Sequence, residues 1–141
     1  MLRIYLLAAF ILFSQATWAT LGERKNINAE TQQKVSGFSQ YQVIETKVDA
    51  TTVREYVNAD GFVFAIAWNG LSHPDLSLYL GKYFSEYDSL VKDSARPAGR
   101  APMTIKTSSL VLTKKGHMRD VRGSAYDPDL LPLDFDLGEL K

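Results

Sequence analysis

Hydrophobic and polar residues alternate with period two along consecutive segments in the first half of the chain. Residues 41–48, YQVIETKV, and 51–57, TTVREYV, carry β-branched and aromatic side chains on both alternating sets, which is typical of strands. Asp49-Ala50 separates the two segments, and 58–61, NADG, supplies a tight turn after them. The pattern predicts an antiparallel meander that continues beyond Gly61.

The third segment of this meander, 61–68, reads GFVFAIAW and alternates large with small side chains. Such alternation predicts a central strand with both faces covered, in which a neighbouring element approaches the small side closely. So short a run cannot cross a bilayer as a helix. The expected large side is Phe62, Phe64, Ile66 and Trp68; the small side is Val63, Ala65 and Ala67.

After Gly70 the period changes to that of a helix. One apolar face predicts an amphipathic helix over residues 75–91, with Ser72 as N-cap and Asp75 reaching back to it. Gly81 lies inside this helix, where glycine costs up to about 1 kcal/mol relative to alanine, so we expect it to permit close packing on Ala65 and Ala67. The face comprises Leu76, Leu80, Tyr83, Phe84 and Tyr87.

The remaining segments complete an α+β fold. A loop at 92–103 precedes a predicted strand at 104–113, a turn at 114–116 and a return strand at 117–122. The tail is expected to lie extended over the domain, anchored by its leucines and Phe135. We therefore predict one domain over residues 41–141, with an antiparallel sheet of about five strands in the order βββαββ and one helix packed across it. Residues 20–40 are predicted to form a polar arm or a short helix over 29–35.

The first 19 residues have the layout of a signal peptide: Arg3, an uncharged apolar run, then small residues at Thr17 and Ala19. We expect cleavage before Thr20 and export to the periplasm or beyond. The alternative is an uncleaved anchor helix, but the apolar run is shorter than the roughly 20 residues that span a bilayer. No membrane segment is expected after cleavage.

Composition excludes several classes of function. Removing Arg3 from the 16 basic residues leaves 15 against 16 acidic residues, so nothing in the net charge favours nucleic acid as a partner. The chain has no cysteine, which excludes a disulfide scaffold, a thiol nucleophile and thiolate metal sites. About 122 residues remain after cleavage, enough for one modest core.

Three blocks of sequence carry a resemblance to a known family. They are VREYVNADGFVFAIAWNG at 53–70, HPDL with LGKYF in the helical region, and GHMRDVRGSAYDPDLLP at 116–132. Together they resemble the exported bacterial proteins of the domain of unknown function 2844 family, from about residue 41 to 132. The resemblance implies export and a single domain. It does not indicate which activity the protein has.

The candidate catalytic residues are the two histidines and their neighbours. His73 with Asp75 places an imidazole and a carboxylate at a helix start, although capping by Asp75 is the simpler interpretation. His117 with Arg119 and Asp120 is the densest polar cluster, although Asp120 points away from His117 in a strand. Neither histidine has a metal-ligand spacing, and no GxSxG occurs. We predict no metal and no cofactor.

Two sets of residues are candidates for ligand binding. Arg96 and Arg100 make the loop before residue 104 basic, which suits an anionic sugar or a partner's carboxylates. Tyr83 and Tyr87 lie one helical turn apart and offer a stacking surface, with core packing as the alternative. The aspartates of the tail suggest calcium, but the EF-hand pattern is absent.

These observations favour a non-enzymatic accessory or binding module of the bacterial cell envelope, whose partner is an envelope protein or a polysaccharide. A small hydrolase or lyase acting on an envelope polymer is the first alternative. A secretion-associated or structural subunit that docks through its C-terminal tail is the second.

Overall fold

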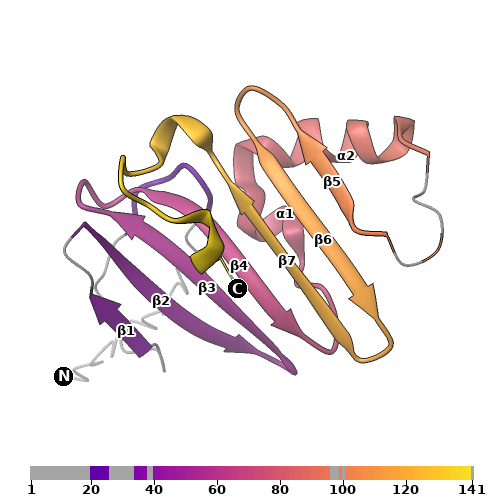
Figure 1. Ribbon diagram of the computed structural model, residues 1–141, viewed down its shortest axis with the longest axis horizontal. Helices are drawn as coiled ribbons and strands as arrows, with labels where there is room; N and C mark the ends of the chain where they lie inside the picture. The colour runs from indigo at the N-terminus through magenta and orange to yellow at the C-terminus, as the bar shows by residue number, and fades with distance from the viewer. Residues whose placement is uncertain (1–19, 26–33, 38–39, 96–98, 100, 141) are drawn as a thin grey trace, which may run out of the picture.

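A seven-stranded antiparallel sheet, in the order β1-β2-β3-β4-β7-β6-β5, organises the computed structural model of the chain (Figure 1). The structure describes residues 20–25, 34–37, 40–95, 99 and 101–140, with 34–37 described for the backbone alone. The fold is α+β, as predicted. The strands are β1 (Lys34–Gly37), β2 (Tyr41–Val48), β3 (Thr51–Asn58), β4 (Val63–Gly70), β5 (Met103–Lys106), β6 (Val111–His117) and β7 (Asp120–Tyr126).

The predicted antiparallel sheet with one helical region packed on it is confirmed, with seven strands where about five were expected. The segment expected as one strand at 104–113 is divided into β5 and β6, because the Thr107 hydroxyl accepts hydrogen bonds from the backbone N–H groups of Ser109 and Leu110 and closes a turn. The turn expected at 114–116 lies instead after His117. Arg119 there has a positive φ of 60°, which a tight hairpin needs.

The predicted helix forms with a bend in its middle. It consists of α1 (Leu76–Leu80), a 3-10 turn (Gly81–Tyr83) and α2 (Phe84–Asp93). Asp75, not Ser72, is the N-cap, since its Oδ1 accepts from the Ser77 N–H at 3.0 Å. Gly81 has φ 49° and a Cβ there would lie 3.0 Å from the Thr20 Cβ, so it accommodates the N-terminal segment and not Ala65 and Ala67.

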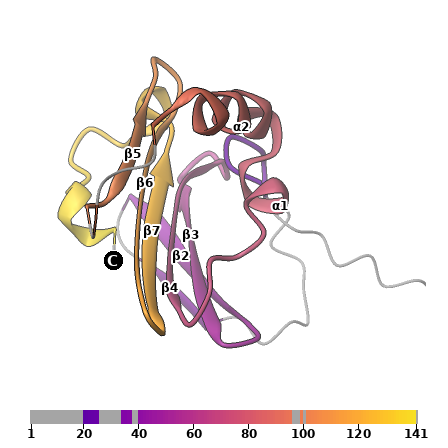
Figure 2. The same ribbon diagram turned by 90° about the vertical axis from the view of Figure 1, so that its right-hand side faces the viewer.

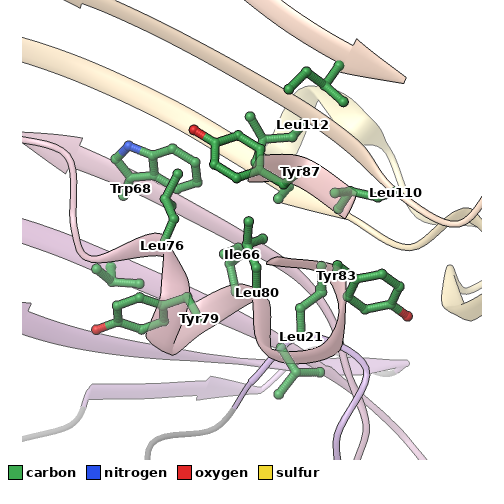
Figure 3. Packing of buried hydrophobic residues seen from close by; sticks show 14 of the residues in the cluster. Leu21, Ile66, Trp68, Leu76, Tyr79, Leu80, Tyr83, Tyr87, Leu110 and Leu112 are labelled. Atoms are coloured by element: carbon green, nitrogen blue, oxygen red, sulfur yellow. The ribbon is translucent and has the colours of Figure 1, made fainter. Parts of the chain in front are cut away.

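The two faces of the sheet are covered by different elements (Figure 2). The helices and the segment 20–25 cover one face, which we call the helix face, and the C-terminal segment lies against the other, the tail face. The helix-face core includes Leu21, Ile44, Val53, Ile66, Trp68, Leu76, Leu80, Leu110 and Leu112 (Figure 3). The tail-face core is Tyr56, Phe64, Ala65 and Ala67, packed against Tyr41, Val43, Tyr126, Leu130, Leu131, Phe135 and Leu140.

β4 is a central strand that is buried from Val63 to Trp68, as GFVFAIAW predicted, but the side chains of Val63 and Phe64 lie on the faces opposite to those expected. Tyr56 pairs with Ala65 while Val57 pairs with Val63, so Phe64 is the extra residue of a β-bulge. The bulge places Phe64 on the tail face with the small residues, and Val63 on the helix face. The small side is therefore covered by the tail, whereas the helix packs on Ile66 and Trp68.

The segment 20–25 is tied into the domain instead of forming a loose arm. Leu21 is fully buried, and its N–H donates to the Tyr79 carbonyl at 2.7 Å. The Gly22 N–H donates to the Val63 carbonyl at 2.8 Å. The short helix predicted over 29–35 falls mostly on residues 26–33, outside the described residues, but its last two positions lie in β1.

Candidate functional site

A hollow of about 420 Å³ lies on the tail face beside the end of the C-terminal segment. Pairing places Thr113 of β6 opposite Ser124 of β7, and Lys115 opposite Arg122, so the four side chains form two adjacent cross-strand rows. Ser124 also pairs with Ala67 of β4, whose side chain lies on the tail face, and paired residues point to the same side of a sheet. Both rows therefore lie on the tail face. The lining residues are Trp68, Pro102, Thr113, Lys115, Arg122, Gly123, Ser124 and Leu140.

A second hollow of about 290 Å³ adjoins the first at the tip of the β6–β7 hairpin. It shares Lys115 and Arg122 with the larger hollow and adds Gly116, His117 and Asp120. His117 pairs with Asp120 across the hairpin end, and both are exposed. We call the two hollows together the β6–β7 groove. The Asp120 carboxylate accepts from Arg122 Nε at 3.0 Å, so its nearest ionic partner is Arg122.

His73 lies on the helix face, on the opposite side of the sheet from this groove. Its Nδ1 accepts a hydrogen bond of 2.9 Å from the Trp68 indole N–H. Partial burial, together with the nearby Lys114 ammonium, lowers the pKa of His73 below its ordinary value. The Asp75 carboxylate is bonded to the backbone N–H and the hydroxyl of Ser77. The geometry therefore assigns Asp75 to helix capping and His73 to orienting the indole of Trp68.

Arg119, the third member of the predicted GHMRD cluster, occupies the hairpin turn and is exposed. The positive φ of Arg119 allows the two-residue turn between His117 and Asp120. The loop arginines Arg96 and Arg100, predicted to bind anions, lie outside the described residues. The sequence hypotheses for these two therefore remain predictions.

Tyr83 and Tyr87 belong to the helix-face core, with exposed fractions of 5% and 7%. The Tyr83 hydroxyl donates to the buried Asp127 carboxylate, and burial followed by this bond raises the pKa of Tyr83 well above its ordinary value. The Tyr87 hydroxyl accepts from Lys114 Nζ at 2.6 Å. Both rings are turned into the protein, so the core alternative, and not the stacking surface, describes them.

The sequence reading missed a buried ion pair between Lys25 and Glu55. Each side chain is 5% exposed, and the two are in direct contact. Burial raises the pKa of the Glu55 carboxyl, and the Lys25 ammonium offsets part of that effect. Glu55 lies on β3 between the buried residues Val53 and Val57. Because a buried carboxylate needs a partner of opposite charge, a glutamate between two buried strand positions indicates that a cationic side chain from another segment packs against it.

The groove residues Lys115, Thr113 and Ser124 were also missed. The sequence reading assigned Lys115 to a turn, which hid its alternation with Thr113 along one strand face. Had the hairpin turn been assigned to Met118-Arg119, the period of two would have placed both residues beside Arg122 and Ser124.

A comparison with family models gives a match over residues 17–140 to the family described as "Protein of unknown function (DUF2844)". The chain belongs to the DUF2844 family. The resemblance predicted from the three sequence blocks is thereby confirmed, and the match extends further toward the N-terminus than those blocks. No curated protein and no solved structure matches this DUF2844 chain.

Among the described residues, no group of three or more His, Cys, Asp or Glu side chains is arranged to hold a metal ion. No helix within the described ranges is long and apolar enough to cross a membrane. A third hollow, of about 530 Å³, lies between the 58–60 turn and tail residues 129–134. Gln40 and Asp134 are hydrogen-bonded beside it at 3.1 Å.

Proposed function

We propose that the protein is an exported, non-enzymatic binding module of the bacterial cell envelope, and that it holds its partner in the β6–β7 groove. The observation that carries this proposal is the uneven cover of the tail face. The C-terminal segment packs on the half formed by β2, β3 and β4, whereas the half formed by β7 and β6 carries the groove. The larger hollow, about 420 Å³, falls in the size range of ligand sites.

The N-terminal sequence supports the export part of the proposal. Residues 1–19 have the charge, apolar run and small residues of a cleavable leader. Cell fractionation with an antibody to the mature chain tests the location; a protein recovered wholly in the cytoplasm would contradict export.

A hydrolase or lyase acting on an envelope polymer is the second candidate function. It is favoured by one observation: His117 and Asp120 face each other across the hairpin end inside the hollow that adjoins the larger one. Incubation of the protein with envelope polymers tests it through the release of new reducing ends or double bonds. Turnover lost in His117→Ala would support the enzyme, whereas binding without turnover would support the module.

The hypothesis of a subunit that docks through its tail loses its basis. The tail packs on its own domain, because Leu130, Leu131 and Phe135 lie against the tail face of the sheet. The Tyr56 hydroxyl also donates to the Glu139 carbonyl at 2.9 Å and fixes the last turn of the tail.

Co-sedimentation with isolated envelope polymers tests the binding module. The variant Thr113→Trp fills the groove without changing charge, and Ser89→Trp adds the same side chain to an exposed position of α2. We expect Thr113→Trp to abolish co-sedimentation and Ser89→Trp to preserve it. Equal binding by both variants would show that the groove is not the site.

A further inference from the structure

The charge of the β6–β7 groove points to the chemistry of its ligand. Lys115 and Arg122 line both hollows, and none of the described residues that line the larger one carries a carboxylate side chain. Lys115 forms no ion pair with a described residue. Arg122 is paired with Asp120, but the pair is more than half exposed on both sides and lies toward the hairpin tip. The larger hollow is therefore lined by two cations, of which Lys115 has no ion-pair partner among the described residues.

Polar groups without charge stand beside these cations. Thr113 and Ser124 are half-buried, on the row next to Lys115 and Arg122. Each hydroxyl donates one hydrogen bond and accepts others, so the pair can match the hydroxyls of a sugar ring. A guanidinium and an ammonium are suited to carboxylates, the first by two parallel bonds and the second as a point charge.

The shape of the groove favours a chain over a compact ion. Its two hollows follow each other along the hairpin and share two cations, so successive units of one ligand would meet the same charged pair. Pro102 and Leu140 give the larger hollow an apolar margin. Gly123 alternates with Arg122 and Ser124 and faces the helix side of β7, where it makes room for the Trp68 ring: a Cβ there would lie 2.1 Å from the indole Cζ2.

We propose that the β6–β7 groove binds a carboxylate-bearing oligosaccharide, with Lys115 and Arg122 holding the carboxylates and Thr113 and Ser124 bonding to the ring hydroxyls. This inference rests on the proposed binding function and specifies its ligand class. The four side chains that it assigns to the ligand all belong to β6 and β7.

Three probes separate charge from sugar chemistry: oligogalacturonate, its fully methyl-esterified form, and poly-aspartate. Calorimetric titration of the purified protein is expected to show binding of oligogalacturonate that weakens as salt rises from about 50 to about 300 mM. The methyl ester is expected to bind at least tenfold more weakly, and poly-aspartate likewise. Lys115→Ala and Arg122→Ala should each reduce affinity for oligogalacturonate by about tenfold or more, which corresponds to about 1.4 kcal/mol.

Lys92→Ala is the matched control, because Lys92 is an exposed lysine on α2 and its loss changes net charge equally. Circular dichroism and unfolding curves verify that the groove variants are folded. Equal affinity for the free acid and the ester would overturn the carboxylate assignment but leave the binding function standing. Equal affinity for poly-aspartate would overturn the sugar assignment. Failure of these probes and of isolated envelope polymers alike would overturn the proposed function itself.

Discussion

The Lys25 ammonium contacts the Glu55 carboxylate in the interior of the protein, and the pair joins the N-terminal segment to the third strand of the sheet. Backbone hydrogen bonds reinforce this connection. The Lys25 N–H donates to the Gly61 carbonyl at 2.9 Å, and the Val63 N–H donates to the Glu23 carbonyl at 3.0 Å. Residues next to the expected cleavage point thus belong to the core of the domain.

Removing only the cation of this pair should be severely destabilising. Lys25→Met leaves the Glu55 carboxylate buried without compensation, which costs about 3–5 kcal/mol of unfolding free energy. The double variant Lys25→Met/Glu55→Leu should recover most of that loss, since an apolar pair needs no desolvation of charge. Urea unfolding at neutral pH measures both, with Lys92→Met as the exposed control. A double variant no more stable than Lys25→Met would contradict the buried pairing.

The bond between Trp68 and His73 should make stability depend on pH. The folded-state pKa of His73 is lowered, so its contribution is present above the unfolded value of about 6.5 and is lost as pH falls through the folded value. Protonation at Nδ1 would deprive the buried Trp68 N–H of its acceptor. We expect His73→Gln to flatten the decline in stability between about pH 7 and pH 5.

Chemical unfolding followed by tryptophan fluorescence at a series of pH values measures this effect. His117→Gln, which removes the other histidine of the chain at an exposed site, should retain the wild-type profile. Identical profiles for His73→Gln and wild type would show that His73 does not control stability over this range.

Enlarging the small side of β4 should displace the tail. Ala65 is fully buried beneath the C-terminal segment, so Ala65→Leu forces overpacking that costs about 1–3 kcal/mol. Limited proteolysis should then cleave the tail faster, and unfolding curves should shift to lower denaturant. Ala59→Leu, at an exposed turn, supplies the matched control. A variant as stable as wild type would mean that the tail does not press on this face.

Phe135 should be the main anchor of the tail. Its ring packs against Tyr41, Tyr56 and Phe64, with centroids 5.1, 5.8 and 4.9 Å away in edge-on geometry. Because Phe135 remains partly exposed, Phe135→Ala should cost less than the roughly 3–5 kcal/mol of a fully buried phenylalanine. Leu133→Ala, at a side chain 102% exposed, should change stability by no more than about 0.5 kcal/mol. Equal losses in the two variants would argue against the aromatic anchor.

The sequence by itself determined the elements that depend on local pattern. Period-two alternation identified β2, β3 and β4, and the helical period identified the face that carries Tyr83 and Tyr87, because side-chain direction follows directly from backbone geometry. Helix capping by Asp75 was also predicted, as the simpler interpretation of the His73–Asp75 pair, because capping depends only on residues close in sequence. The order of three sequence blocks, at 53–70, in the helical region and at 116–132, indicated the family, although the class of fold did not depend on them.

Only the tertiary structure decided which element covers which face. The bulge at Phe64 exchanges the expected sides of Val63 and Phe64, since one extra residue in a strand shifts the alternation, and the sequence pattern alone cannot reveal it. The contact of Lys25 with Glu55 spans 30 residues, and the groove joins β6 and β7 to Pro102 and Leu140. Such pairings depend on the free energy of packing distant segments together, which no local window of sequence contains.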